Sequence, residues 1–191
     1  MNSARSIVSP FRVLALDTST HTGWAHDVGA DDAPSGEVEY GTLDLSGWRP
    51  AVVGRSYVQL LDFVMHKCAA ARITHVIIEK PLNVYAHAGF QGTKARKDPD
   101  LAAALMGFVV VAETAARKAG CQCFTVAPET VRAGFLGRGR GKPKDPKTAV
   151  TVACRQMGWK PRDDNQADAL ATWFYSKRAL EASRSLFDAQ T

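Results

Sequence analysis

Apolar runs and alternating positions along the first third of the chain predict β-strands. Residues 12–17 (RVLALD) form a short apolar run that ends in Asp17, which is typical of a strand buried on both faces. A second strand is predicted to begin at 23–25 and a third to cover 37–45, where apolar and polar residues alternate. Because short links join these three segments, we expect an antiparallel meander.

Helices and strands alternate in the rest of the chain. Residues 50–71 have a helical period, with one apolar face, and residues 74–79 (THVIIE) repeat the opening pattern of an apolar strand that ends in a carboxylate. In the last predicted helix, Asp163 is the N-cap and Gln166 completes a capping box. The other predicted elements are a helix over 100–118 that is apolar nearly all round, a strand over 121–126, and helices over 128–135 and 146–157.

This order of elements predicts one mixed α/β domain. We expect about five strands, three antiparallel and two parallel, with helices on both faces of the sheet. The domain is predicted to cover residues 11–188, after a disordered leader over residues 1–10. The leader has no apolar core of a secretory signal, and the longest apolar run, 101–111, is shorter than the roughly 20 residues that cross a bilayer. We therefore expect a cytoplasmic protein with no membrane partner.

Charge adds a candidate binding surface. The net charge is +5, and the sequence pI is about 9.1. Basic residues gather in two segments rich in Gly or Pro, which favours contacts with phosphates over the alternative of solvated loops. The four cysteines have no zinc-binding spacing and are predicted to be reduced thiols. The candidate phosphate contacts are Lys94, Arg96, Lys97, Arg138, Arg140, Lys142, Lys144 and Lys147.

Carboxylates in three segments form the candidate catalytic site. Asp17 and Glu79 end two predicted parallel strands, whose carboxyl ends meet at one edge of a sheet. On the last helix, Asp168 shares a face with Asp164 (i, i+4) and with Asn165 (i, i+3). Clustered carboxylates repel one another unless a cation is present, and Mg²⁺ or Mn²⁺ prefers such oxygen ligands. Two ions about 4 Å apart would support phosphodiester hydrolysis, so these residues favour a nuclease.

Each carboxylate also has a purely structural interpretation. Asp17 could cap a turn, Glu79 could pair with Lys80 or Arg72, and Asp164 could be a first-turn residue favoured by the helix dipole. For any one residue alone the structural interpretation is preferred. For the set, we prefer the metal site.

Four sequence blocks, in this order, resemble the RuvC-type Holliday junction resolvases. They are VLALDTSTHTGWA, THVIIEKP, VAPETVRAGFLGRGRGKPKDPKTAV and DDNQADALATW, and together they cover nearly the whole chain. The resemblance implies an RNase H-like fold. It also implies a homodimer that nicks two strands of a four-way DNA junction with Mg²⁺, for which Mn²⁺ would substitute. A strand that ends in Asp and hydroxyl residues, as in the first block, also opens sugar-kinase/actin-like ATPases and tRNA-threonylcarbamoylation proteins, whereas the last block is not usual in those families.

The resemblance assigns roles to individual residues. Asp17, Glu79 and Asp168 match the family's metal-binding positions. The fourth position, three residues before the final aspartate, is Asn165 here, so either Asn165 ligates through its carbonyl or Asp164 takes the role. One lysine of Lys142, Lys144 or Lys147 resembles a phosphate-contacting lysine. The segment with Tyr85 and Phe90 looks more like viral or prophage relatives, which would act in the host cytoplasm, and either ring could stack on an unpaired base.

Two other functions compete with a junction-resolving nuclease. LALDTST also occurs in actin-like ATPase folds and tRNA-modification components, but the only glycine-rich basic segment follows a predicted helix and not a strand. A junction-binding protein with weakened catalysis would explain Asn165. For the homodimer, the apolar helix over 100–118 is the predicted interface.

Overall fold

The computed structural model describes residues 11–28, 37–80, 99–137 and 145–188, with helix side chains described up to Arg184. The predicted leader over residues 1–10 lies outside these ranges. So do most of the predicted DNA contacts, namely Tyr85, Phe90, Lys94, Arg96, Lys97, Arg138, Arg140, Lys142 and Lys144. Among those contacts, only Lys147 is placed.

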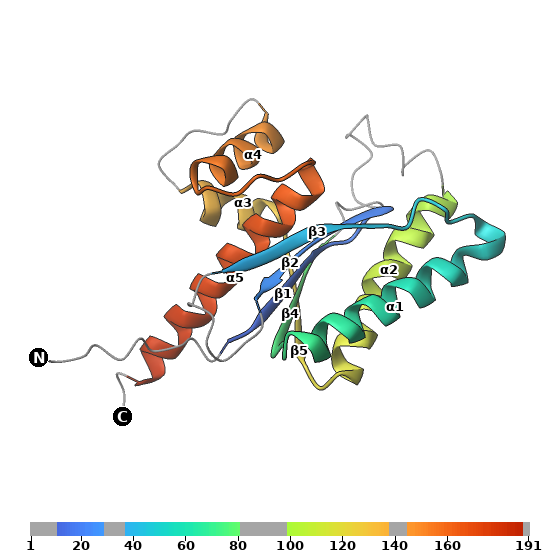
Figure 1. Ribbon diagram of the computed structural model, residues 1–191, viewed down its shortest axis with the longest axis horizontal. Coiled ribbons are helices and arrows are strands. Elements are labelled where there is room, and N and C mark those ends of the chain that lie inside the picture. The colour runs from blue at the N-terminus through green and yellow to red at the C-terminus, as the bar shows by residue number, and fades with distance from the viewer. Residues whose placement is uncertain (1–10, 29–36, 81–98, 138–144, 189–191) are drawn as a thin grey trace, which may run out of the picture.

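Five strands form a single mixed sheet, as predicted. The order across the sheet is β3-β2-β1-β4-β5 (Figure 1). The pairs β1–β2 and β2–β3 are antiparallel, and the pairs β1–β4 and β4–β5 are parallel. The second strand begins at His21, two residues before its predicted start. The strands are β1 (Val13–Asp17), β2 (His21–Asp27), β3 (Val38–Asp44), β4 (His75–Glu79) and β5 (Gln122–Val126).

Helices cover both faces of the sheet. The helices form two groups that pack on opposite faces of the sheet (Figure 1). The helices of the first face are α1 (Val53–Ala70), which follows the 3₁₀ turn η1 (Pro50–Val52), and α2 (Pro99–Lys118). Those of the second face are α3 (Pro128–Leu136), α4 (Pro146–Gln156) and α5 (Asp164–Asp188).

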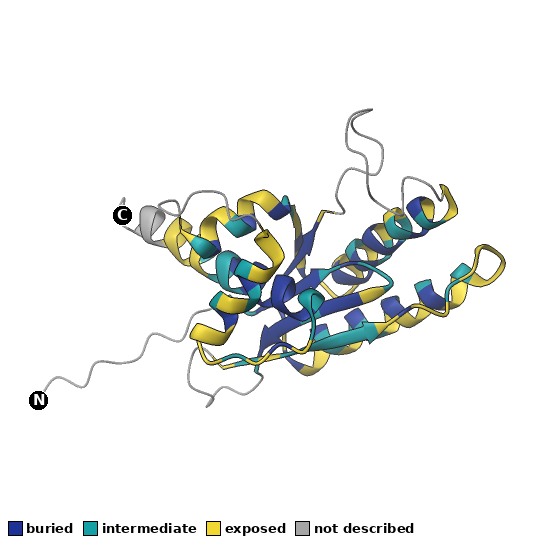
Figure 2. Ribbon diagram, turned by 90° about the horizontal axis from the view of Figure 1, so that it is seen from above, coloured by how far each residue is buried: buried dark blue, intermediate teal, exposed yellow. Residues whose placement is uncertain are grey.

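Alternation along β1 sorts its side chains between these two layers. Leu14 and Leu16 belong to the core under α1 and α2, whereas Val13 and Ala15 belong to the core under α3–α5. The strand period of two therefore directs Asp17 to the α5 face. The same alternation in β4 directs Glu79 to that face, because Ile77 packs there and Ile78 packs on the other side. Figure 2 shows the buried sheet between the two helical layers.

Helix α2 is apolar on more than its core face. Phe108 and Val109 are buried against α1 and the sheet, but Met106 and Val110 are 42% and 60% exposed. By length and composition alone, α2 is the one helix in the described ranges that is apolar enough to cross a membrane. A core helix passes the same test, and the packing of α2 in this fold accounts for much of its apolarity.

The start of α5 is fixed by polar contacts with β3. The Asp163 carboxylate accepts a hydrogen bond from the Gln166 backbone N–H at 2.8 Å, which confirms the predicted N-cap. The second bond of the predicted capping box differs, because Gln166 Oε1 accepts from Arg162 N instead of the cap's own N–H. Thr42 on β3 donates to Asp163 and accepts from Gln166. These bonds hold the first turn of α5 over the sheet.

Candidate metal-dependent active site

The two strand-terminal carboxylates lie level with each other. In the parallel β1–β4 pair, Asp17 and Glu79 are register partners at the carboxyl ends of both strands. Both side chains lie on the α5 face by strand alternation. The position expected from the sequence is therefore the one that the sheet adopts.

A glycine allows α5 to approach these carboxylates. Gly23 on β2 is the antiparallel register partner of Asp17. A Cβ at Gly23 would lie only 2.0 Å from the backbone oxygen of Asn165, so the first turn of α5 rests directly on β2 at this point. This close approach brings Asp168, which is 5% exposed, into electrostatic contact with Asp17 and Glu79.

Burial and neighbouring acidic charges raise the pKa of all three carboxylates. Burial, followed by repulsion from Asp168, raises the pKa of Asp17 to about 7. Burial and then the charges of Asp17 and Asp168 raise the pKa of Glu79 to about 8. The pKa of Asp168 is also raised, chiefly by burial. Such a group of buried acids is stable as a set of anions only when cations compensate it.

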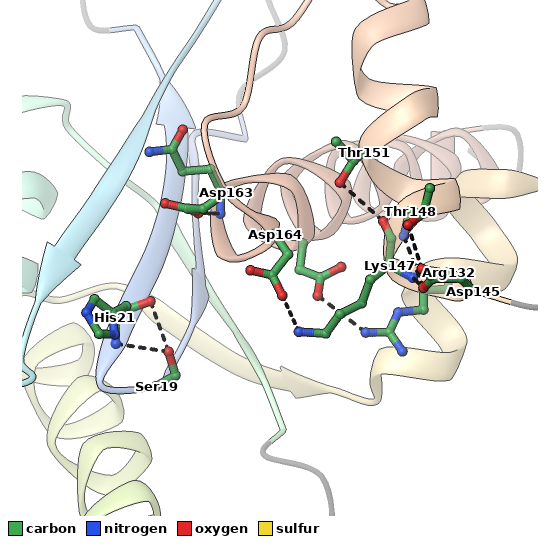
Figure 3. Close-up of polar contacts among 11 residues, drawn as sticks. Ser19, His21, Arg132, Asp145, Lys147, Thr148, Thr151, Asp163 and Asp164 are labelled. Atoms are coloured by element: carbon green, nitrogen blue, oxygen red, sulfur yellow. Dashed lines mark hydrogen bonds and ion pairs between the residues drawn. The ribbon is translucent and has the colours of Figure 1, made fainter. Parts of the chain in front are cut away.

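Two basic side chains supply part of that compensation. Arg132 of α3 places Nη2 3.3 Å from Asp168 Oδ2, and Lys147 of α4 forms an ion pair with Asp164 (Figure 3). The hydrogen bond from Lys147 lowers the pKa of Asp164. Asp145 caps α4 by accepting from the backbone N–H groups of Lys147 and Thr148, which fixes the helix that carries this lysine.

The donor chemistry suits a hard divalent cation, although the side chains do not already form a cage. Three buried or half-buried carboxylates with raised pKa values supply the oxygen ligands that Mg²⁺ or Mn²⁺ prefers. Within the described ranges, no three His, Cys, Asp or Glu side chains are close enough to hold a metal ion in their present conformations. Arg132 and Lys147 provide a physical reason, because each binds an acidic side chain of α5.

The two candidates for the fourth ligand lie in different surroundings. The charge of Asp164 raises the pKa of both Asp17 and Asp168, so its carboxylate is close enough to act on the cluster. Asn165 packs its backbone and Cβ against Gly23 on β2. This placement favours Asp164 over Asn165 as the residue that completes the set.

Three contributors to the site carry no obvious signal in the sequence. Arg132 lies within an ordinary amphipathic helix, and Thr172 is one polar residue in an apolar stretch, yet its hydroxyl donates to Glu79 Oε2 at 3.2 Å. Gly23 looks like any strand glycine until α5 is placed over it. A basic residue in the third sequence block was the only available signal for Arg132.

Among the comparisons with known proteins, the one with solved structures identifies the fold. No protein-family model matches the chain, and no curated protein matches it. Among solved structures, Thermus thermophilus RuvC superposes with a TM-score of 0.61 at 18% identity, covering 90% of this chain and 97% of RuvC. T. thermophilus RuvC in complex with a Holliday junction substrate gives 0.59 at 20% identity, covering 86% and 92%. The yeast mitochondrial Holliday junction resolvase Ydc2 gives 0.55 at 12% identity, covering 98% and 87%.

These structural neighbours agree with the resemblance seen in the four sequence blocks. The likeness extends over nearly the full length of this chain and of each neighbour. The five-stranded mixed sheet with helices on both faces is thus the RNase H-like fold of the RuvC-type Holliday junction resolvases.

Proposed function

We propose that this protein is a metal-dependent endonuclease that resolves four-way or branched DNA junctions. The observation that carries the proposal is the cluster of Asp17, Glu79 and Asp168, whose pKa values are all raised, chiefly by burial, at the carboxyl edge of a RuvC-type sheet. Buried acids with perturbed pKa values are expected at catalytic sites and are costly elsewhere. The Holliday junction resolvases among the structural neighbours support junction DNA as the substrate.

The metal would be held by side chains from both strands and from α5. Asp17, Glu79 and Asp168 supply the ligands, with Asp164 in preference to Asn165 as the fourth. Two Mg²⁺ ions, or Mn²⁺ in their place, would activate a water molecule and stabilise the leaving oxygen of the phosphodiester. Arg132 would keep Asp168 ionised and oriented.

Lys147 is suited to contact the DNA backbone. Its side chain is 55% exposed and reaches Asp164 from the start of α4, so it lies at the rim of the carboxylate cluster. The basic segments predicted from the sequence around residues 94–97 and 138–144 would add further phosphate contacts, which would make binding dependent on salt concentration. We therefore expect branched DNA to bind across the carboxyl edge of the sheet.

Paired nicking requires two active sites, so we propose a homodimer. The exposed apolar residues Met106 and Val110 lie on α2, on the face of the molecule away from α5. A second copy that covers them would leave both carboxylate clusters accessible to DNA. The protein would act in the cytoplasm.

A catalytically weakened junction binder is the second candidate. It is favoured by Asn165 at the fourth position and by the two basic side chains already bound to Asp164 and Asp168. Such a protein would bind four-way junctions equally well with and without Mg²⁺ and would not nick them even with Mn²⁺. An ATPase-fold protein is disfavoured by the fold comparisons, and binding of a nucleotide without metal-dependent nicking would revive it.

The deciding experiment is a cleavage panel. It compares a four-way junction, a three-way junction, a flap, a linear duplex and an RNA/DNA hybrid, each with Mg²⁺ and with Mn²⁺. We expect symmetric nicks in the four-way junction and a loss of at least about 10²-fold in the Asp17→Asn variant, the scale of removing one preorganised catalytic group. Asp62→Asn, which changes an exposed acid on α1, is the matched control and should nick normally. Unchanged nicking by Asp17→Asn would refute the proposed site.

A further inference from the structure

Thr172 presents a buried hydroxyl in the middle of α5. The residue is fully buried, and the residues before it are the buried, apolar Ala169, Leu170 and Ala171. A threonine inside a helix usually donates its hydroxyl to the carbonyl one turn earlier. Thr172 instead donates across the helix–sheet interface, from Oγ1 to Glu79 Oε2 at 3.2 Å. Because a buried hydroxyl without a hydrogen-bond partner is unfavourable, this bond to Glu79 is what satisfies the Thr172 hydroxyl.

Glu79 needs a donor of this kind. The residue is 6% exposed, and among the described residues Thr172 is the one that donates a hydrogen bond to its carboxylate. The charges of Asp17 and Asp168 repel its charge, and Arg132 offsets only part of this repulsion because the pKa of Glu79 is still raised. A hydrogen bond to one carboxylate oxygen removes rotational freedom about the last side-chain torsion and leaves the other oxygen available.

The same contact links two separate elements of the site. Thr172 lies one helical turn after Asp168, so the two residues share the face of α5 that points at the sheet. Glu79 lies at the end of β4, 93 residues away in sequence. The hydroxyl thus fixes the position of the β4 carboxylate relative to the helix that carries the α5 carboxylate.

We propose that Thr172 is a positioning residue that orients the Glu79 carboxylate for a divalent cation shared with Asp17 and Asp168. This inference rests on the proposed metal site and assigns a supporting residue to it. Groups that orient metal ligands in this way change metal affinity by roughly 10- to 100-fold when they are removed. Thr172 itself does not contact the cation or the DNA.

The test is Mn²⁺ affinity of the full chain without DNA, measured by titration calorimetry and by the electron paramagnetic resonance signal of free Mn²⁺. Thr172→Val removes the hydroxyl and keeps the side-chain shape, and we expect binding to weaken by about 10- to 100-fold. Thr172→Ser keeps the hydroxyl and should retain most of the affinity. Thr114→Val is the matched control, because the Thr114 hydroxyl donates to Val110 O within its own helix.

The variants separate positioning from packing. If Thr172→Val does not fold, the pair Thr172→Ala and Thr172→Ser carries the comparison, because these two differ only by a hydroxyl. Equal Mn²⁺ affinity with and without the hydroxyl overturns the inference, and so does equal weakening in Val and Ser variants. If the unaltered protein binds no Mn²⁺, the proposed metal site itself fails and the inference fails with it. If Asp17→Asn abolishes Mn²⁺ binding while Thr172→Val does not weaken it, the metal site stands and only the role of Thr172 is lost.

Discussion

The two faces of the sheet use the same strands for different purposes. On the α1/α2 face, β1 and β4 contribute Leu14, Leu16, Val76 and Ile78, all of which are fully buried and apolar. On the α3–α5 face, Val13 and Ala15 of β1 and Ile77 of β4 precede the carboxylates that end the two strands, and the covering helix α5 adds further acids. One face is a plain hydrophobic core, and the other changes along its length from core to charged site.

The two faces of the sheet therefore need different kinds of contact. The α1/α2 face needs only apolar residues of suitable volume, because burial of apolar area stabilises it without directional contacts. The α3–α5 face needs directional contacts, namely the ion pair of Arg132 with Asp168 and the hydrogen bond of Thr172 to Glu79. Substitutions on the two faces should therefore fail in different ways.

The largest effect on nicking is expected from Gly23→Ala. The new Cβ would lie 2.0 Å from Asn165 O, so α5 must move away from β2 and carry Asp164 and Asp168 with it. We expect loss of nicking by at least about 10²-fold and a fall of about 1–3 kcal/mol in the free energy of unfolding. Junction cleavage and chemical denaturation measure the two. Gly54→Ala, where the added Cβ meets nothing within 4 Å, is the control. Normal cleavage by Gly23→Ala would show that α5 does not need this approach.

The next effect is the pH dependence of the metal-free protein. The folded-state pKa values of Asp17 and Glu79 are raised to about 7 and about 8, so folding favours their protonated forms. This contribution to stability is fully present below about pH 4 and is lost as the pH rises to about 8. We expect the free energy of unfolding to fall by several kcal/mol over this range, as measured by urea denaturation. Asp17→Asn should flatten the curve, and added Mn²⁺ should restore stability at pH 8. A flat profile for the unaltered protein would contradict the buried acid cluster.

A smaller effect, on dimerisation, is expected from a substitution on α2, which covers the opposite face of the sheet. Val110 is 60% exposed on α2, so Val110→Glu should leave folding intact but place a charge in the proposed dimer interface. We expect the dissociation constant of the dimer to rise by at least about tenfold, which is a loss of about 1.4 kcal/mol of association free energy. Light scattering across a dilution series measures it. Val152→Glu, on the exposed side of α4, is the control. A dimer unaffected by Val110→Glu would place the interface elsewhere.

The smallest effect is expected from Arg132→Gln. Its partner Asp168 is 7% exposed at the side chain, while Arg132 itself is 21% exposed, so solvent screens part of the pair. We expect a loss of about 1 kcal/mol in metal-free stability at pH 8, reduced when Mn²⁺ is present. Arg117→Gln breaks the exposed pair with Glu113 and should cost less than about 0.5 kcal/mol. Equal effects from the two substitutions would show that Arg132 has no special role at the site.

The sequence by itself determined the elements and the main acids. The apolar runs that end in Asp17 and Glu79 are local patterns, and strand period is read directly from neighbouring residues. Helix starts at Pro128, Pro146 and the Asp163 cap follow from residues within one turn of each start. Fold class followed because the order of these elements allows few arrangements.

Only the tertiary structure decided how the acids are supported. The approach of Asn165 to Gly23, the ion pair of Arg132 with Asp168, and the bond from Thr172 to Glu79 each join segments that are far apart along the chain. Such contacts depend on how α5 packs over the sheet, and no local pattern encodes them. The site is thus a local motif at the ends of two strands, completed by long-range packing that only the folded chain reveals.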